Sequence, residues 1–273
     1  MKGLVIKKNA NLFTIEHDEK LVNLMPSGKT RASGIFVGDI VEFDDAITKV
    51  YERKNILIRP PIANLDKMFI VISSIPKPDF ILIDKIIIYC HLNDIEPIIV
   101  INKVDIVNED FIKSVKEDYK CYKVLCASAK NNELSSLENE IEGICAFAGQ
   151  SAVGKSSLIN SVFKSKQADV GNLSKKIERG KQTTRIVSLY KFKKGYIADT
   201  AGFSMLDLSM VSNINERELS SYYPDFLEGR ALCKYRSCLH EFGECGVISL
   251  VKSGQIKKRR YSNYLQILEE LKK

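Results

Sequence analysis

Residues 149–157 read Gly149-Gln150-Ser151-Ala152-Val153-Gly154-Lys155-Ser156-Ser157. The run matches the phosphate-binding pattern G-x-x-x-x-G-K-[ST] and lies between a strand-like segment, 144–148, and a helix-like segment, 156–163. Its glycines allow backbone N–H groups to surround a β-phosphate, and the following helix N-terminus adds a favourable field. Lys155 is expected to reach the β- and γ-phosphates, and Ser156 to offer its hydroxyl to Mg²⁺. The sequence therefore predicts a nucleotide site after this strand.

Strand-like and helix-like segments alternate around this loop. From about Asn64, apolar runs of strand length are separated by helix-like stretches, which indicates βαβ units and a mostly parallel sheet buried on both faces. A hairpin is expected at 186–198, around Lys193-Lys194-Gly195. The other expected strands are 68–72, 97–101, 123–126 and 144–148, and the expected helices are 80–92, 109–118, 134–141 and, near the C-terminus, 259–271.

Two loops after predicted strands favour guanine over adenine. The first reads Asn102-Lys103-Val104-Asp105, and its carboxylate can accept hydrogen bonds from guanine N1–H and N2–H₂, which adenine lacks. The Asn102 amide can meet guanine O6 or tie loops together. The second loop reads Ser128-Ala129-Lys130, and the Ala129 N–H is placed for O6. Each motif is weak alone, but their positions at strand ends together predict a GTP/GDP site.

A third motif, Asp199-Thr200-Ala201-Gly202, follows the expected strand 196–198 and matches D-x-x-G. We expect Asp199 to reach Mg²⁺ through water and the Gly202 N–H to meet the γ-phosphate. In ordinary small GTPases the P-loop comes first, but here the guanine loops precede Gly149, so the G domain is circularly permuted. The D-x-x-G motif leads straight into the C-terminal residues, and a nucleotide-dependent movement could pass to them through the backbone.

A metal site is predicted near the C-terminus. The pattern Cys233-x4-Cys238-x-His240-x4-Cys245 supplies three thiolates and one imidazole within 13 residues, the full set of a closed tetrahedral zinc site. No position is left for water, so the expected role is structural, folding a module too small for a large core. Free thiols are the alternative.

Composition narrows the function classes. The 273 residues are 45% hydrophobic and 27% charged, which excludes a disordered or collagen-like chain. No apolar stretch approaches the ~18–20 residues that cross a bilayer, and the lysine-rich N-terminus does not resemble a signal peptide, so a cytoplasmic protein is expected. The net charge is +7, but residues 164–194 hold ten basic and two acidic residues, or +8. A second basic run spans 252–260. Each run is compatible with RNA binding or with a charged surface that is merely exposed to solvent.

The first 60 or so residues read as short β segments with turns between them, which fits a five-stranded barrel, either OB-like or SH3-like. Arg59-Pro60-Pro61 is expected to be a stiff extended connector. Motif positions then divide the chain into 1–63, 64–209 and 210–273. The three parts are an N-terminal β-barrel, a central α/β P-loop domain and a mostly helical zinc-binding domain.

These motifs resemble those of the RsgA type of ribosome small-subunit-dependent GTPase. The resemblance covers nearly the whole chain and rests on Arg59-Pro60, the permuted motif order, the cysteine cluster and Gly180-Lys181-Gln182-Thr183-Thr184. It implies an N-terminal OB-fold that binds RNA, a permuted G domain and a C-terminal zinc domain. It also implies slow GTP hydrolysis, stimulated by the 30S subunit during late maturation, with GTP-dependent binding to rRNA.

At the positions where related GTPases carry the residue that orients the attacking water, this chain differs from both Ras-like enzymes and the RsgA family. Ras-like enzymes have a glutamine just after D-x-x-G, where this chain has Phe203. The family usually has a histidine at the position of Gln182, and the Gln182 amide is the candidate that replaces it; a merely exposed residue is the alternative. Thr183 or Thr184 is expected to complete the Mg²⁺ shell.

Two other functions are weighed against a 30S-stimulated, monomeric GTPase. The first is an RNA-binding module that guanine nucleotides control, with incidental turnover. The second, a metabolic P-loop kinase, is disfavoured by the guanine loops and by the basic segment 164–194.

Overall fold

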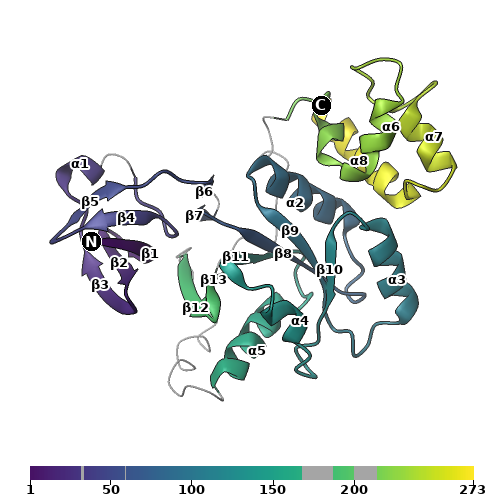
Figure 1. Cartoon of the computed structure of the whole chain (residues 1–273). Coiled ribbons are helices and arrows are strands. Elements are labelled where there is room, and N and C mark those ends of the chain that lie inside the picture. Colours follow the sequence, from purple (N-terminus) through teal and green to yellow (C-terminus); the bar gives the residue numbers. More distant parts are fainter. Residues whose placement is uncertain (32–33, 59, 168–186, 200–213) are drawn as a thin grey trace.

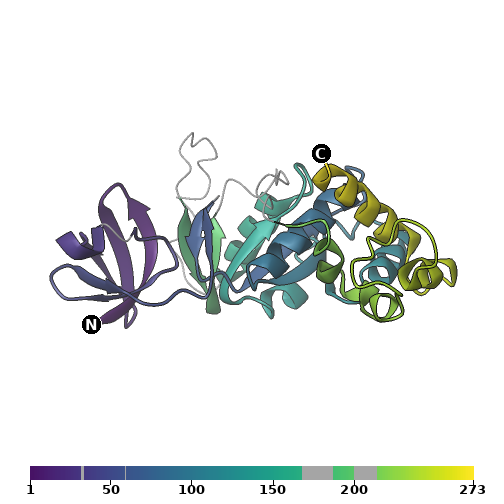
Figure 2. The ribbon, with the colours of Figure 1, turned by 90° about the horizontal axis from the view of Figure 1, so that it is seen from above.

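The computed structural model describes residues 1–31, 34–58, 60–167, 187–199 and 214–273. The elements form three groups in a row, N-terminal strands, a sheet flanked by helices, and C-terminal helices (Figures 1 and 2). Five parallel strands and one antiparallel strand build the central sheet in the order β10-β9-β8-β11-β13-β12. They are β8 (Lys67–Ile72), β9 (Glu96–Ile101), β10 (Lys123–Cys126), β11 (Glu142–Ala148), β13 (Lys194–Asp199) and the antiparallel β12 (Ser188–Phe192).

Helices cover both faces of this sheet, because its strands are apolar on both sides. Along β8, Met68 and Ile70 belong to one core, whereas Phe69 and Val71 belong to the other. The first core includes α2 (Phe80–Leu92) and α3 (Glu109–Asp118), and the second includes α4 (Ser135–Glu138) and α5 (Lys155–Gln167). The predicted parallel sheet and most of its elements are confirmed, although the helix expected at 134–141 is shorter.

Helices α2 and α3 begin at side-chain caps. The Asp79 carboxylate accepts a hydrogen bond from Leu82 N, and the Asn108 side chain accepts one from Phe111 N, which satisfies backbone donors that the first turn leaves unpaired. No helix among the described ranges is long and apolar enough to cross a membrane.

The N-terminal strands form a closed ring of pairings. Strand β1 pairs with both β2 and β4, β2 pairs with β3, and β4 pairs with β5. The ring closes where Ile47 N donates to Met25 O at 3.0 Å and Ser27 N donates to Ile47 O at 2.9 Å. A separate apolar core, which includes Val5, Ile15 and Phe43, fills it. The elements are β1 (Lys2–Asn9), β2 (Leu12–His17), β3 (Lys20–Leu24), the one-turn α1 (Gly28–Arg31), β4 (Ile40–Phe43) and β5 (Ile47–Val50).

The prediction of an extended connector at 59–61 is wrong at Pro60 and Pro61, whereas Arg59 lies outside the described residues. Strands β6 (Ile56–Ile58) and β7 (Pro61–Ala63) form a tight antiparallel hairpin in which Ile58 pairs with Pro61. Pro60 lies in the turn and Pro61 in a short two-stranded ribbon, positions where a missing backbone N–H is tolerated. The prolines therefore shape a turn instead of an extended link.

The N-terminal strands contact the central sheet at one edge. Lys7 of β1 is paired with Ser188 of β12, and the Lys191 ammonium lies 2.8 Å from Glu16 and 3.8 Å from Glu19. Lys193 in turn pairs with Glu138 at 2.9 Å. Two cations of the basic segment 164–194 thus hold elements of this chain together.

The C-terminal part is mostly helical, as expected. It packs on α2 mainly through its last helix (Figure 1). Its elements are the 3₁₀ turns η2 (Leu219–Tyr222) and η3 (Pro224–Phe226), and the helices α6 (Leu227–Ala231), α7 (Gly246–Lys252) and α8 (Lys258–Leu271).

Arg260 joins this part to α2 through a buried ion pair. Its guanidinium bonds to the Asp84 carboxylate and lies 3.1 Å from Asp225, and the Arg260 and Asp84 side chains are 1% and 0% exposed. Asp84 also accepts hydrogen bonds from Tyr119 Oη and Asn263 Nδ2, each at 2.9 Å. Burial alone would lower the pKa of Arg260, but the two carboxylates raise it well above its ordinary value. The Arg260 charge is therefore retained in the interior, where the guanidinium is paired with these carboxyl groups.

The basic run 252–260 is largely used in the same docking surface. Beside Arg260, the Arg259 guanidinium bonds to Asp118 and stacks 4.1 Å from the Phe80 ring. Lys257 pairs with Glu117 at 2.9 Å. Three of its five cations thus bind acidic residues of α2, α3 and the C-terminal turns, which leaves less of this run for RNA.

Replacing Arg260 by leucine should weaken the docking of α8 by about 3–5 kcal/mol, because the Asp84 carboxylate would stay buried without its cation. Hydrogen exchange of the α8 amides, with urea unfolding, measures the loss. Lys257→Leu is the matched control: it removes an exposed ion pair in the same run and should change little. Similar small effects for both variants would contradict the importance of the buried pair.

Candidate functional site

The P-loop residues connect β11 to α5 and require glycine at two points. Gly149 has φ +130° and Gly154 has φ +96°, values that L side chains rarely adopt. A Cβ on Gly149 would lie 2.3 Å from the Val71 carbonyl oxygen, and one on Gly154 would lie 2.4 Å from Asn102 Nδ2. The loop therefore packs tightly against the ends of two neighbouring strands.

Lys155, at the start of α5, folds back over this loop. Its ammonium donates hydrogen bonds of 2.8 Å to the carbonyl oxygens of Gly149 and Gln150, and partial burial lowers the pKa of the amine. Ser156 and Ser157, the next residues, are exposed at the helix start. An incoming phosphate would offer Lys155 a charged acceptor in place of two neutral carbonyls.

Asn102 ties the β9 loop to the P-loop. Its Nδ2 donates to Val153 O at 2.8 Å across 51 residues of sequence, and its Oδ1 is buried without a hydrogen-bond partner among the described residues. Lys103 reinforces the link, because its ammonium donates to Ala152 O at 2.9 Å and to Ile75 O at 2.8 Å. Of the two roles open to the Asn102 amide, its NH₂ group performs the loop-tying one here.

Asp105 faces the second predicted base loop. Its carboxylate accepts a 2.7 Å hydrogen bond from Ser128 Oγ and lies 3.7 Å from the Lys130 ammonium. The Ser128 bond, with a smaller contribution from Lys130, lowers the pKa of Asp105. The group is therefore a carboxylate at neutral pH, which is the form that accepts two hydrogen bonds.

One cavity of about 530 Å³ joins these loops, a volume typical of sites for small ligands. Four of its residues lie outside the motifs that predict the site: Ile106, Asn160, Ser161 and Lys164. Asn160, Ser161 and Lys164 follow Ser157 at spacings of three, four and seven residues, so they share one face of α5. This helical spacing is the sequence signal that could have identified them. The lining comprises Asn102, Lys103, Asp105, Ile106, Ala129, Lys130, Gly154, Ser157, Asn160, Ser161 and Lys164.

Other residues predicted to bind the nucleotide lie around the same loops and strand ends. Val104 N donates to Ala127 O at 3.3 Å, which joins the two base loops. Asp199 ends β13, which runs parallel to β11, so both strands lead to the same edge of the sheet. Gln150 Oε1 accepts a hydrogen bond of 3.1 Å from Asp79 N at the start of α2. Outside the described residues lie Gln182, Thr183, Thr184 and Gly202.

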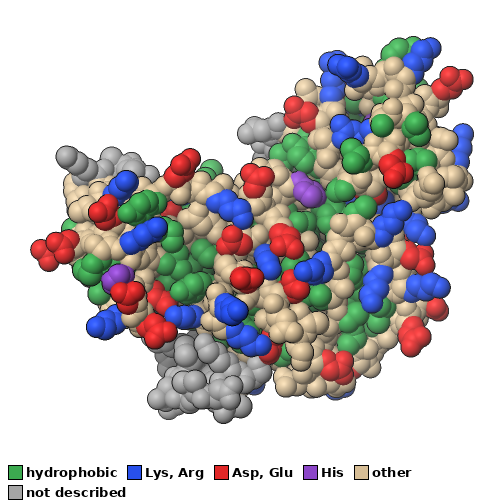
Figure 3. All heavy atoms as spheres, viewed as in Figure 1, with side chains coloured by type: hydrophobic (Ala, Val, Ile, Leu, Met, Phe, Trp, Pro, Cys, Tyr) green, Lys and Arg blue, Asp and Glu red, His purple; other side chains and the backbone are tan. Residues whose placement is uncertain are grey.

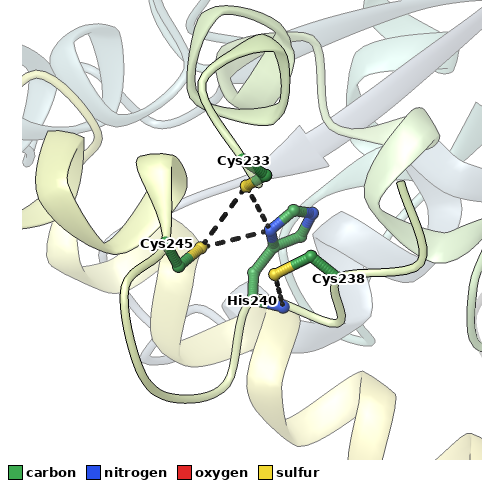
Figure 4. Close-up of side chains that lie close together, drawn as sticks. All are labelled: Cys233, Cys238, His240 and Cys245. Atoms are coloured by element: carbon green, nitrogen blue, oxygen red, sulfur yellow. Dashed lines mark hydrogen bonds between the residues drawn. The ribbon is translucent and has the colours of Figure 1, made fainter. Parts of the chain in front are cut away.

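The cysteine and histidine side chains converge at a second site (Figure 4). Cys233 and Cys245 Sγ are 3.7 Å apart, and His240 Nδ1 lies 3.4 Å from Cys233 Sγ and 3.3 Å from Cys245 Sγ. With Cys238, all four ligand atoms lie within 4.8 Å of one another. Tetrahedral zinc would space two sulfurs by about 3.8 Å and a sulfur and a nitrogen by about 3.5 Å, so the donor set fits zinc.

The pKa shifts of His240 and Cys245 are also compatible with a bound metal cation. Burial lowers the pKa of His240 to about 4, so the imidazole is neutral. Burial raises the pKa of Cys245 to about 11, so a thiolate there needs a compensating positive charge. The ligand loop is held by α8, since Tyr261 Oη donates to His240 O at 2.7 Å and Tyr264 Oη donates to Leu239 O at 2.8 Å.

Comparison with known proteins gives relatives along the whole chain. The family model for RsgA GTPase matches residues 50–209. "Small ribosomal subunit biogenesis GTPase RsgA 2" of Oceanobacillus iheyensis is 38% identical, and the RsgA of Halalkalibacterium halodurans is 35% identical, each match covering 99% of this chain and 97% of the relative.

Solved structures give the same assignment. YjeQ from Thermotoga maritima superposes with a TM-score of 0.81 at 32% identity, over 99% of this chain and 98% of its own. YloQ, described as a circularly permuted GTPase, superposes with a TM-score of 0.80 at 32% identity, over 99% and 94%. With its P-loop after its guanine-type loops, the chain belongs to the RsgA GTPase family.

Proposed function

We propose that this chain hydrolyses GTP during biogenesis of the small ribosomal subunit and that the 30S subunit stimulates the reaction. The observation that carries the proposal is the shared cavity of Asp105, Ala129 and Gly154, which joins the base loops to the P-loop in a member of the RsgA family. The names of the relatives supply the ribosomal process.

Guanine binding follows from the acceptors and donors around the cavity. Asp105 would accept from N1–H and N2–H₂ of the base, and Ala129 N–H would donate to O6. Ser128 and Asn102 would keep these loops in place through their present hydrogen bonds. An adenine would leave the Asp105 carboxylate without donors, which is the basis of discrimination.

Phosphate binding is assigned to residues 149–157. Their backbone N–H groups would surround the β-phosphate, and Lys155 would exchange its two carbonyl partners for the β- and γ-phosphates. Mg²⁺, when bound, would neutralise charge between these phosphates. The residues proposed to hold it are Ser156, Thr183 or Thr184, and Asp199 through water.

We assign orientation of the attacking water to Gln182. Phe203 occupies the position after D-x-x-G and has no polar group, so unstimulated turnover would be slow. Gln182 carries an amide that can hold a water, and Gly202 N–H would meet the γ-phosphate.

The three proposed parts have separate roles. Residues 1–63 would form an OB-type barrel that binds rRNA. The pairing order β3-β2-β1-β4-β5, with a bridge between Pro26 and Ile47 joining its two ends, supports this. Residues 64–209 would form the permuted G domain, and 210–273 a domain folded around one structural zinc ion. Cys233, Cys238, His240 and Cys245 would hold that ion. We propose a cytoplasmic monomer with 30S and its rRNA as partners.

GTP turnover should rise many-fold when purified 30S subunits are added to the full chain, and 50S subunits should not replace them. Release of phosphate measures the rate. Gln182→Ala should lower the stimulated rate without changing GDP affinity, because it removes the water-orienting amide and leaves the base loops intact.

Three outcomes would count against this assignment. Stimulation by 50S alone would reassign the partner, and a normal stimulated rate in Gln182→Ala would remove that residue from the mechanism. GTP-dependent binding to 30S with no stimulation would favour the alternative of a nucleotide-controlled RNA-binding module.

Asp105→Asn should lower GTP affinity by about a hundredfold or more, because the amide cannot accept both guanine donors. Xanthosine triphosphate, which has a carbonyl where guanine has N2–H₂, should bind the variant better than it binds the parent. Isothermal titration measures both affinities. Lys116→Ala is the control, since Lys116 is exposed on α3 and does not line the cavity. Unchanged GTP affinity in Asp105→Asn would refute the base assignment.

The purified chain should contain one zinc ion per molecule by mass spectrometry of metals. Cys245→Ala should lose the ion and the exchange protection of α7 and α8, because structural zinc supplies folding energy to a small module. Cys121→Ala alters an exposed cysteine away from the cluster and should keep both. Full protection of these helices in a metal-free chain would contradict the structural role.

A further inference from the structure

Two aromatic side chains are exposed on the loops between the metal-ligand residues. Tyr235, between Cys233 and Cys238, is 64% exposed, and Phe242, between His240 and Cys245, is 82% exposed. Large aromatic side chains in a folded domain usually bury most of their surface. In the view of Figure 3, hydrophobic side chains lie among charged ones over the C-terminal part, at the upper right. Aromatic rings held in solvent in this way fit a surface that another molecule covers.

Both rings are carried by loops with fixed ends. The four ligand atoms that delimit the loops lie within 4.8 Å of one another, and Cys238 N donates to Tyr235 O at 3.2 Å to close a turn. Tyr261 of α8 binds the carbonyl of His240, and α8 is anchored by Arg260. Because the loops are already ordered, little conformational entropy would be lost when a partner covers the rings.

The charges beside the rings favour an anionic partner. The loop that carries Tyr235 contains Lys234 and Arg236 and no acid, and the Lys234 ammonium lies 5.5 Å from the Tyr235 ring centroid. On the other loop, both Glu241 oxygens accept from the Lys272 ammonium at 2.7 Å, which neutralises that carboxylate. Glu244 adds one negative charge there. The cations are thus concentrated beside Tyr235.

We propose that these two loops bind unpaired bases of RNA, with Tyr235 and Phe242 stacking on the bases and Lys234 and Arg236 contacting the backbone phosphates. Exposed aromatics beside cations are the combination that binds single-stranded nucleic acid. A duplex hides its base faces within its own stack, so it offers these rings nothing to stack on. The inference rests on the proposed function, because it names how the chain would grip ribosomal RNA.

The first experiment uses the absence of tryptophan from the chain. Phe242→Trp places a single fluorophore on the loop, and a twelve-nucleotide oligoadenylate is the probe. Stacking should quench the fluorescence. When the same strand is in a duplex, equal quenching should require at least a fivefold higher RNA concentration. Leu227→Trp is the control, because Leu227 is 68% exposed on α6, outside the ligand loops, and should not respond. No quenching, or equal quenching by strand and duplex, would overturn the inference.

The second experiment measures affinity for 30S subunits. Tyr235→Ala with Phe242→Ala should weaken binding about fivefold or more for each base stack lost, with zinc content unchanged. Tyr235→Phe with Phe242→Tyr keeps both rings and should restore parental affinity, which a merely structural loss would not do. If the parent chain is stimulated by 30S and the alanine variant binds 30S equally well, the stacking inference fails and the proposed function stands. If 30S does not stimulate the parent but oligoadenylate quenches the fluorescence of the Phe242→Trp variant, the stacking inference stands and the proposed function fails.

Discussion

The hydrogen bond from Asn102 Nδ2 to Val153 O holds together an edge of the sheet on which the proposed nucleotide site depends. It joins loops that are 51 residues apart and lies beside Gly154, where a Cβ would meet the same amide at 2.4 Å. Parallel strands deliver all of these loops to one edge whatever their order in the chain. Circular permutation is therefore compatible with the site, because the contacts that assemble it are spatial and do not depend on which motif comes first.

A second constraint fixes the C-terminal part to the same framework. Arg260 is buried against Asp84 of α2, and the residue before α2, Asp79, binds the P-loop residue Gln150. A buried ion pair is weak evidence for net stability, but removing one partner leaves a costly charge, so the pair specifies one docking arrangement. The helix that carries Asp84 therefore lies between the nucleotide loop and the zinc-type cluster.

Local patterns in the sequence predicted most elements of the central sheet, since apolar runs of strand length and helix-like stretches are local properties. The hairpin at 56–63 was missed because prolines suggest extension when their pairing partner is not known. The basic run 252–260 was ambiguous for a different reason: Arg260 and Asp84 are 176 residues apart, and no local pattern reveals such a pair. Asn160 and Ser161 of α5 line the cavity beside Ser157, and their helical spacing from Ser157 is the local signal that places them there.

The docking of α8 also limits how the nucleotide state can act on the C-terminal part. In the sequence, the D-x-x-G motif precedes this part directly, which is the basis of the hypothesis that a movement passes along the backbone. A swing of the whole part would separate Arg260 from Asp84 and expose Tyr119 and Asn263, all of which now satisfy one another. That cost is far larger than the cost of rearranging a surface segment. Coupling through the backbone is therefore expected to leave α8 docked on α2, with the Cys/His loops held on α8 by Tyr261 and Tyr264.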